Sequence, residues 1–97
     1  ALSFNYPETK QEIEILINET GIDAENAKKL VAIGSKIRNL TELGLTETVS
    51  TRLLVNAATL INSGLPKRLS THIAIVEPLT DDLQTIQSLK DLCDLMI

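Results

Sequence analysis

One arginine stands where helix electrostatics would favour an acidic residue. The segment Thr48-Val49-Ser50-Thr51-Arg52 leads into an apolar run, and Ser50 is a typical N-cap residue. Arg52 would then be the second residue of the helix, beside unpaired backbone N–H groups and the positive end of the helix dipole. A cation in that position costs about 0.3–1 kcal/mol, so its presence needs an explanation.

Two explanations follow from the residues. Arg52 can turn back to pair with Glu42 or Glu47 of the preceding loop, as exposed arginines often do. Alternatively, the helix N-terminus and the guanidinium together form an anion site suited to a phosphate. Lys67 and Arg68 at the start of the next helix are a weaker example of the same arrangement, and there we expect only solvated side chains.

Other arrangements that carry chemistry are missing from the sequence. His72 is the single histidine, and no cysteine or carboxylate lies at ligand spacing beside it, so we expect no metal site. Gly34-Ser35-Lys36 lacks the upstream glycine and the strand of a phosphate loop. Cys93, the single cysteine, excludes an intrachain disulfide, and its place on an apolar helix face predicts a buried side chain. We therefore do not expect this chain to be an enzyme by itself.

Composition narrows the class of protein. With 97 residues the chain suits one domain, and its net charge of -4 disfavours binding to nucleic acid or to an anionic membrane. The same charge disfavours a DNA-binding helix-turn-helix around Gly64. No apolar run approaches the ~20 residues of a membrane span, and no signal peptide opens the chain. A lone cysteine fits a reducing compartment, so we expect a cytoplasmic protein.

The spacing of apolar residues predicts an all-α fold, a small bundle of about five helices. The first helix covers about 7–20 and stops at Gly21, and the second follows an Asp23 cap. After a connection at 40–49, the third runs from the Ser50 cap to residue 63. The fourth covers about 66–76 and stops at Glu77-Pro78. The fifth follows a Thr80 cap to the C-terminus, with two aspartates in its first turn.

Helical spacing also predicts which residues face the core, and it makes the helix after Ser50 the central and most buried one. Gly34 is tolerable within its helix if another helix approaches closely there. Basic residues of the second helix, Lys28, Lys29, Lys36 and Arg38, are expected on a solvated face. The residues expected to face inward, helix by helix, are Ile13, Leu16 and Ile17; Ala27, Leu30, Val31, Gly34 and Ile37; Leu54, Ala57, Ala58 and Ile61; Leu69, Ile73 and Val76; and Leu83, Ile86, Leu89, Leu92, Cys93 and Met96.

Several of these short stretches together resemble a known family. The sensor 2 helix of MoxR-type AAA+ ATPases is similar to Val49-Ser50-Thr51-Arg52-Leu53-Leu54 followed by Ala57-Ala58 and Leu60-Ile61. The CbbQ/NirQ/NorQ branch of that family is similar at Phe4-Asn5-Tyr6-Pro7, Ile37-Arg38-Asn39-Leu40 and Glu77-Pro78-Leu79-Thr80-Asp81-Asp82. The resemblance extends over nearly the whole chain and corresponds to the C-terminal helical lid of these proteins.

The resemblance implies a role for Arg52. It matches the sensor 2 arginine, a catalytic and ATP-binding residue that contacts the γ-phosphate of ATP held on the large domain. Many MoxR relatives have proline at the position of Thr51. The CbbQ/NirQ/NorQ branch tends to have threonine there, as this chain does. Residues 1–6 would be a linker from a missing N-terminal AAA+ core, and residues 7–97 the helical lid. ATP and Mg would belong to the parent protein, with no cofactor in this fragment alone.

The resemblance further implies a parent ATPase that acts as a chaperone-like activator of metalloenzymes or Rubisco. Such proteins form homo-oligomeric rings, commonly hexamers, and work with a von Willebrand factor A-type partner protein. An alternative is a helical protein-interaction module without a nucleotide role. Its motivation is that Ile15, Ile33 and Ile75 lie off the main apolar stripes and could form a docking surface.

Overall fold

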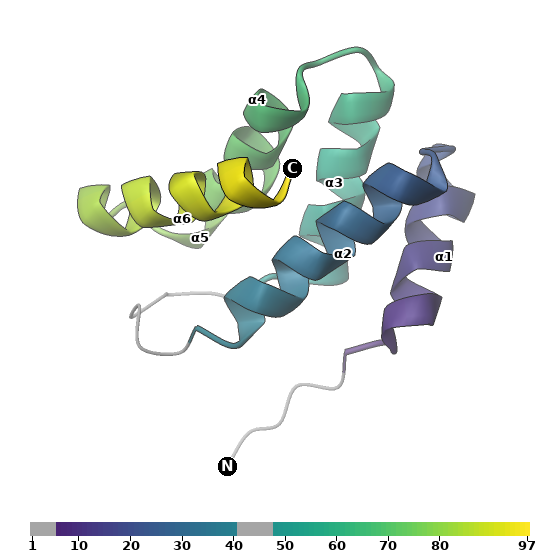
Figure 1. The fold of residues 1–97 in the computed structure, drawn as a ribbon, viewed down its shortest axis with the longest axis horizontal. Coiled ribbons are helices and arrows are strands. Elements are labelled where there is room, and N and C mark those ends of the chain that lie inside the picture. The colour runs from purple at the N-terminus through teal and green to yellow at the C-terminus, as the bar shows by residue number, and fades with distance from the viewer. Residues whose placement is uncertain (1–5, 41–47) are drawn as a thin grey trace.

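The computed structural model describes residues 6–40 and 48–97, and within these ranges every regular element is a helix (Figure 1). The prediction of a small all-α bundle is therefore confirmed. None of the described helices is both long and apolar enough to cross a membrane. The elements are α1 (Thr9–Thr20), α2 (Ala24–Arg38), α3 (Thr51–Asn62), α4 (Lys67–Thr71), the π-helical turn η2 (His72–Val76), α5 (Glu77–Leu79) and α6 (Leu83–Met96).

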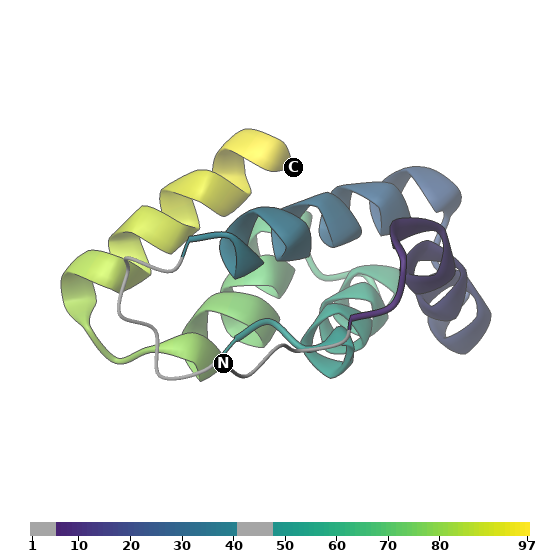
Figure 2. The ribbon, with the colours of Figure 1, turned by 90° about the horizontal axis from the view of Figure 1, so that it is seen from below.

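The helices form two layers. Figure 2 shows α2 and α6 in one layer and α3 with the α4–α5 segment in the other, while α1 lies at one end. The shortest dimension of the molecule is 18 Å, which suits two layers of helices that are each about 10 Å thick. Helix α3 packs against α1, α2, α4 and η2, so its predicted central place is confirmed. The prediction that it is the most buried helix is wrong, because α2 contributes more fully buried residues.

Helix boundaries largely follow the predicted cap chemistry. The Asp23 carboxylate accepts a hydrogen bond from the backbone N–H of Asn26, and the Ser50 hydroxyl accepts one from Leu53. Gly21 adopts the left-handed conformation, with φ of 76°, and ends α1. These caps satisfy backbone groups that would otherwise have no partner at the helix ends.

The cap of the last helix differs from the prediction. Asp82, not Thr80, caps α6, since its carboxylate accepts hydrogen bonds from the backbone N–H and the hydroxyl of Thr85, at 2.9 and 2.7 Å. The Thr80 hydroxyl instead accepts from the Asp82 N–H and stabilises the turn before the helix. Asp81 consequently precedes the helix rather than lying in its first turn.

The proline after the fourth helix does not end it as predicted. The chain continues through η2, where the Glu77 N–H donates to the His72 carbonyl five residues back. Pro78 then lies in the first turn of α5, where a backbone N–H is not required. A wider turn followed by a new helical start therefore accommodates the proline.

The α2–α3 contact is the best predicted part of the core. Ala27, Leu30 and Ile37 of α2 are buried, as are Leu54, Ala57 and Ala58 of α3. A Cβ added to Gly34 would lie 3.0 and 3.2 Å from the two methyl groups of Leu54. The glycine therefore allows α2 and α3 to approach closely, which confirms the expectation for this position.

The inward face of α4 was predicted wrongly. Leu69 and Ile73 are 46% and 40% exposed, whereas Ser70 and Thr71 are fully buried. Both hydroxyls donate to carbonyls of their own segment, Ser70 to Pro66 and Thr71 to Arg68, at 2.9 Å each. Because these polar groups are satisfied locally, small hydroxyl side chains can take core positions that apolar spacing assigned to larger ones.

At other apolar positions the exposure also differs from the prediction. Leu83 of α6 is 81% exposed although it was expected to face inward. Ile33 and Ile75 are fully buried although they lie off the main stripes, so they cannot form the docking surface suggested above. Val76, Leu89 and Cys93 are buried as predicted.

Candidate functional site

Arg52 lies in the first turn of α3 with an exposed side chain. That turn contains no acidic residue, unlike the first turns of α1 and α2, which contain Glu12 and Glu25. Among residues 6–40 and 48–97, Arg52 takes part in no side-chain hydrogen bond or ion pair. Glu42 and Glu47, the loop acids offered as partners for it, lie outside the described residues.

A buried ion pair lies directly behind this turn. The Arg38 guanidinium of α2 donates from Nη1 and Nη2 to the two carboxylate oxygens of Glu12 of α1, at 2.9 and 2.7 Å. The Glu12 and Arg38 side chains are only 1% and 10% exposed. This paired geometry is the strongest that an arginine and a carboxylate can form.

The same pair holds the start of α3. Arg38 Nε donates to the Val49 carbonyl at 2.7 Å, and Thr51 Oγ1 donates to Glu12 Oε2 at 2.8 Å. Val49 and Thr51 flank the Ser50 cap, and Arg52 is the next residue along the helix. Two hydrogen bonds from one buried pair therefore fix the backbone on both sides of the cap.

The segment before α1 closes over this pair. The Tyr6 ring lies 3.8 Å from the Arg38 guanidinium carbon, a cation–π contact, and the Tyr6 hydroxyl shares a 2.7 Å hydrogen bond with Thr48 Oγ1. Residues from α1, α2, the chain before α1 and the chain before α3 thus meet around one guanidinium.

The pair also determines the charge of Glu12. Burial raises the pKa of this carboxyl, but hydrogen bonds from Arg38 and Thr51 and the Arg38 charge together lower it below its ordinary value of 4.5. Glu12 is therefore ionised at neutral pH, and Arg38 compensates its charge. The positive end of α3 and the Arg52 cation consequently do not face an uncompensated carboxylate at this position.

Neither Glu12 nor Arg38 was identified as a functional residue from the sequence, and Arg38 was wrongly expected on a solvated face. A signal existed in the helical spacing. Glu12 lies four residues before Leu16, and Arg38 lies four residues after Gly34, so each continues a buried stripe of its helix. Charged residues of opposite sign on two core-facing stripes are compatible with a buried ion pair.

A second polar cluster lies between α4, η2 and α6. Asp94 is 3.0 Å from His72 Nε2 and 3.4 Å from Arg68 Nε. Arg68 is 68% exposed and Lys67 is also exposed, in line with the expected solvation at the start of α4. This cluster contains one carboxylate and one histidine, and the described residues hold no group of three or more metal-ligating side chains.

Cys93 has neither the accessibility nor the charge state of a reactive thiol. Its side chain is fully buried, and burial raises its pKa to about 11. The thiol is therefore protonated at neutral pH and serves as a small core residue, as the sequence predicted.

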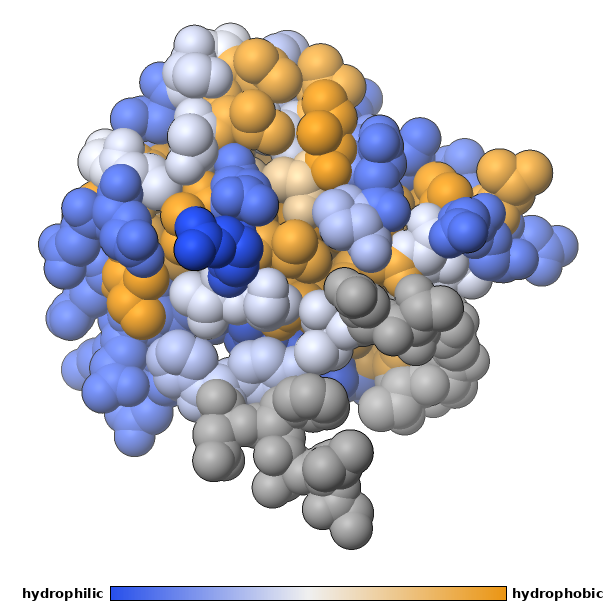
Figure 3. Space-filling view, turned by 180° about the vertical axis from the view of Figure 1, so that it is seen from behind, coloured by the Kyte–Doolittle hydropathy of each residue, from blue (hydrophilic) through white to orange (hydrophobic). Residues whose placement is uncertain are grey.

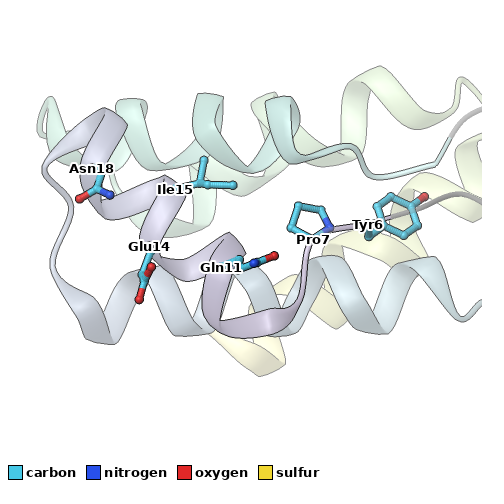
Figure 4. A pocket seen from close by; sticks show the side chains of 6 residues that line it. All are labelled: Tyr6, Pro7, Gln11, Glu14, Ile15 and Asn18. Atoms are coloured by element: carbon cyan, nitrogen blue, oxygen red, sulfur yellow. The ribbon is translucent and has the colours of Figure 1, made fainter.

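The surface depression beside α1 has no chemistry suited to an anion. It has a volume of about 560 Å³ and is lined by Gln11, Glu14, Ile15 and Asn18 together with Tyr6 and Pro7 (Figure 4). Figure 4 shows the four α1 side chains along one helix and the other two on the segment before it. Its lining contains a carboxylate and no cation, so this depression is not a candidate anion site.

Arg52 belongs to the layer that Figure 3 presents to the viewer. On this face apolar residues reach the surface in the middle and upper part, surrounded by hydrophilic residues. The partly or fully exposed apolar side chains of this layer are Leu53, Leu60 and Ile61 of α3, Leu69 of α4 and Ile73 of η2. The exposed arginine is thus carried by a helix that is only partly covered.

Comparison with known proteins assigns the chain to a family. Residues 12–96 match the family model described as CbbQ/NirQ/NorQ C-terminal. The chain is 42% identical to the denitrification regulatory protein NirQ of Pseudomonas aeruginosa over all 97 residues, which are 37% of that protein. It is 44% identical to CbbQ of Hydrogenophilus thermoluteolus over 82 residues, and 41% identical to NorQ of Paracoccus denitrificans over 92. These matches cover 84% and 95% of this chain but only 31% and 34% of those relatives.

The chain therefore spans about a third of the length of the curated relatives that it matches. The matched family model and the relatives agree with the branch that the sequence resembles. The chain belongs to the CbbQ/NirQ/NorQ C-terminal family.

Proposed function

We propose that this chain is the C-terminal lid of a cytoplasmic AAA+ ATPase, and that Arg52 is its sensor 2 arginine. In this role the guanidinium contacts the γ-phosphate of ATP bound on another domain of the full-length protein. Arg52 stabilises the charge that develops on the phosphoryl oxygens during hydrolysis. Movement of the lid against the nucleotide then couples the state of the phosphate to the shape of the protein.

The observation that carries this proposal is the exposed Arg52 at the start of α3. The first turn of α3 offers backbone N–H groups and the positive end of a helix dipole, and it has no acidic residue of its own. Glu12, the carboxylate that contacts this turn through Thr51, is already paired with Arg38. A cation held at a positive helix end is suited to a phosphate oxygen.

In the proposed ATPase, most contacts to ATP and Mg come from the part of the protein outside this chain. This chain contributes one cation to ATP, so the isolated chain should bind ATP very weakly. We assign Mg to the rest of the full-length protein, together with the phosphates of ATP that Mg binds.

The test is Arg52→Ala in the full-length protein. If Arg52 stabilises the transition state, kcat for ATP hydrolysis should fall by roughly 10²-fold. Arg68→Ala is the matched control, since Arg68 is likewise exposed and is likewise the second residue of its helix, α4. Unchanged turnover in Arg52→Ala, or an equal loss in both variants, would refute the sensor role.

Assembly and client belong to the same proposal. We expect the full-length protein to form a homo-oligomeric ring, a hexamer, and to act with a von Willebrand factor A-type partner on a metalloenzyme or on Rubisco. Similarity to NirQ, CbbQ and NorQ supports membership of the family, and the activity itself is our proposal. Light scattering with ATP present measures the mass of the assembly, and a monomeric mass would contradict the ring.

A second candidate function is a protein-interaction module without a nucleotide role. It is favoured by the exposed apolar side chains Leu69, Ile73, Leu83 and Leu95, which are 46%, 40%, 81% and 85% exposed. Replacing Leu69 and Ile73 by serine should then abolish client binding, while Arg52→Ala should leave all activities unchanged. A loss of ATP hydrolysis in Arg52→Ala, with hydrolysis unchanged in the variant of Leu69 and Ile73, would instead support the lid.

A further inference from the structure

The start of α3 is held from behind by side chains that do not belong to α3. Arg38 Nε donates to the carbonyl of Val49, just before the cap, and Glu12 accepts from the hydroxyl of Thr51, just after it. Because the pair itself is joined by two hydrogen bonds of 2.9 and 2.7 Å and is almost fully buried, it has little freedom to move. The direction of the first turn of α3 is therefore set by α1 and α2.

We propose that Glu12 and Arg38 are positioning residues for Arg52: they fix the first turn of α3 by holding Val49 and Thr51, and Arg38 neutralises the Glu12 carboxylate that Thr51 contacts. This inference rests on the proposed function of Arg52 and adds residues that act through it. Neither Glu12 nor Arg38 contacts the nucleotide in this scheme.

Positioning explains why an arginine is used at residue 38. Its three donor nitrogens serve two different acceptors, the Glu12 carboxylate and the Val49 carbonyl. A lysine ammonium keeps the charge but cannot reproduce the planar fork that reaches both. The Tyr6 ring, stacked on the guanidinium, further restricts its orientation.

The positioning role extends to the segment before α1. Tyr6 contacts Arg38 through its ring and Thr48 through its hydroxyl, so the chain that enters α1 and the chain that enters α3 are tied to the same guanidinium. In a protein of the relatives' length, a change in the direction of the entering segment would reach Arg52 through one side chain.

The experiment is a double-mutant cycle in the full-length protein between Arg38→Lys and Arg52→Ala. The quantity measured in each variant is the rate of ATP hydrolysis. Displacement of a contacting group by about 1 Å can cost up to about 10²-fold in rate, so Arg38→Lys alone should lower kcat by roughly 10- to 100-fold. If it acts through Arg52, the same change should have no further effect in the Arg52→Ala background. Arg68→Lys, at the exposed pair, should leave kcat unchanged.

Hydrogen exchange of the backbone amides of residues 53–55 provides a readout independent of ATP, because Leu53 is the first residue of α3 whose N–H is bonded back to Ser50. Arg38→Lys and Glu12→Gln should each speed exchange there at least tenfold, while thermal unfolding still occurs above the assay temperature. Amides in α6 should exchange as in the wild type. This pattern distinguishes local loss of position from general loss of stability.

The outcomes separate the two proposals. If Arg52→Ala has no effect on hydrolysis, the sensor role is refuted, and the amide exchange alone decides whether Arg38 positions α3. If Arg52→Ala is impaired but Arg38→Lys has normal kcat, or loses activity equally with and without Arg52, the positioning role is refuted and the sensor role stands. Unchanged exchange at residues 53–55 in Arg38→Lys would also refute it.

Discussion

The Glu12–Arg38 pair behind α3 and the Arg68–Asp94 pair between α4 and α6 join the same two chemical groups in different surroundings. Glu12 and Arg38 are 1% and 10% exposed, with two hydrogen bonds between them. Arg68 and Asp94 are 68% and 31% exposed, with one contact of 3.4 Å. Water competes for the second pair and is almost excluded from the first.

This difference shows what burial changes in an ion pair. A buried charge that loses its partner is left without solvation, whereas an exposed charge simply returns to water. The buried pair is therefore costly to break and specifies how three segments meet. The exposed pair adds little to stability and leaves Arg68 free to move.

The largest expected difference between the pairs comes from removing each arginine. Arg38→Met keeps much of the side-chain volume but leaves Glu12 ionised and unpaired, so the free energy of unfolding should fall by about 3–5 kcal/mol. Arg68→Met, the matched control, should cost less than about 1 kcal/mol. Denaturant unfolding of both variants measures the difference.

The double variant Glu12→Leu with Arg38→Met sharpens this result. It removes both charges, so it should be more stable than Arg38→Met alone. If the double variant is no more stable than the single one, the loss comes from packing rather than from an uncompensated carboxylate.

A smaller effect is expected from the hydroxyl that joins the buried pair to α3. Thr51→Val keeps the shape of the side chain but removes the hydrogen bond to Glu12, which should cost about 1.5–3 kcal/mol, the range for a bond to a charged group. Thr59→Val is a control, since its hydroxyl donates to a neutral backbone carbonyl of its own helix. Equal losses of stability in the two variants would argue against a special role of the Glu12 contact.

Acid should weaken the buried pair by titrating Glu12. Because the pKa of Glu12 in the folded protein is below 4.5, its contribution to stability is complete above that value and is lost as the pH falls below it. Unfolding measured between pH 7 and pH 3 should show this loss in the wild type. Glu12→Gln should lack that part of the pH dependence, and identical pH profiles would contradict the assignment.

The smallest effect belongs to the exposed pair. Asp94→Asn should change the free energy of unfolding by less than about 1 kcal/mol, and by still less in 1 M salt, where the Debye length is about 3 Å. A loss above 2 kcal/mol that persists in high salt would mean that Asp94 also supports His72, its 3.0 Å neighbour.

Local sequence determined much of this fold. Asp23 and Ser50 cap their helices, Gly21 ends α1, and the buried faces of α2 and α3 follow helical spacing. Each of these features depends on residues within one or two turns of each other, where side-chain chemistry and backbone geometry are directly linked. The close approach of another helix at Gly34 could be predicted for the same reason, since a glycine on a buried stripe indicates a close neighbour.

Arg52 illustrates a partial prediction. Its place in the first turn of α3 follows from the Ser50 cap and was predicted correctly. The sequence could not show that Glu12 lies behind that turn, because Glu12 and Thr51 are 39 residues apart and on different helices. The role of Arg52 itself stays a prediction that awaits the hydrolysis experiment.

By itself, the sequence thus determined the starts of α2 and α3, the stop of α1 and the core of the α2–α3 contact, all of which depend on local spacing. Only the tertiary structure decided that Arg38 is buried against Glu12, that Ser70 and Thr71 replace Leu69 and Ile73 in the core, and that a π turn precedes Pro78 and leads into α5. Burial of a polar side chain depends on whether a partner from elsewhere satisfies it. That partner becomes available only when the helices pack.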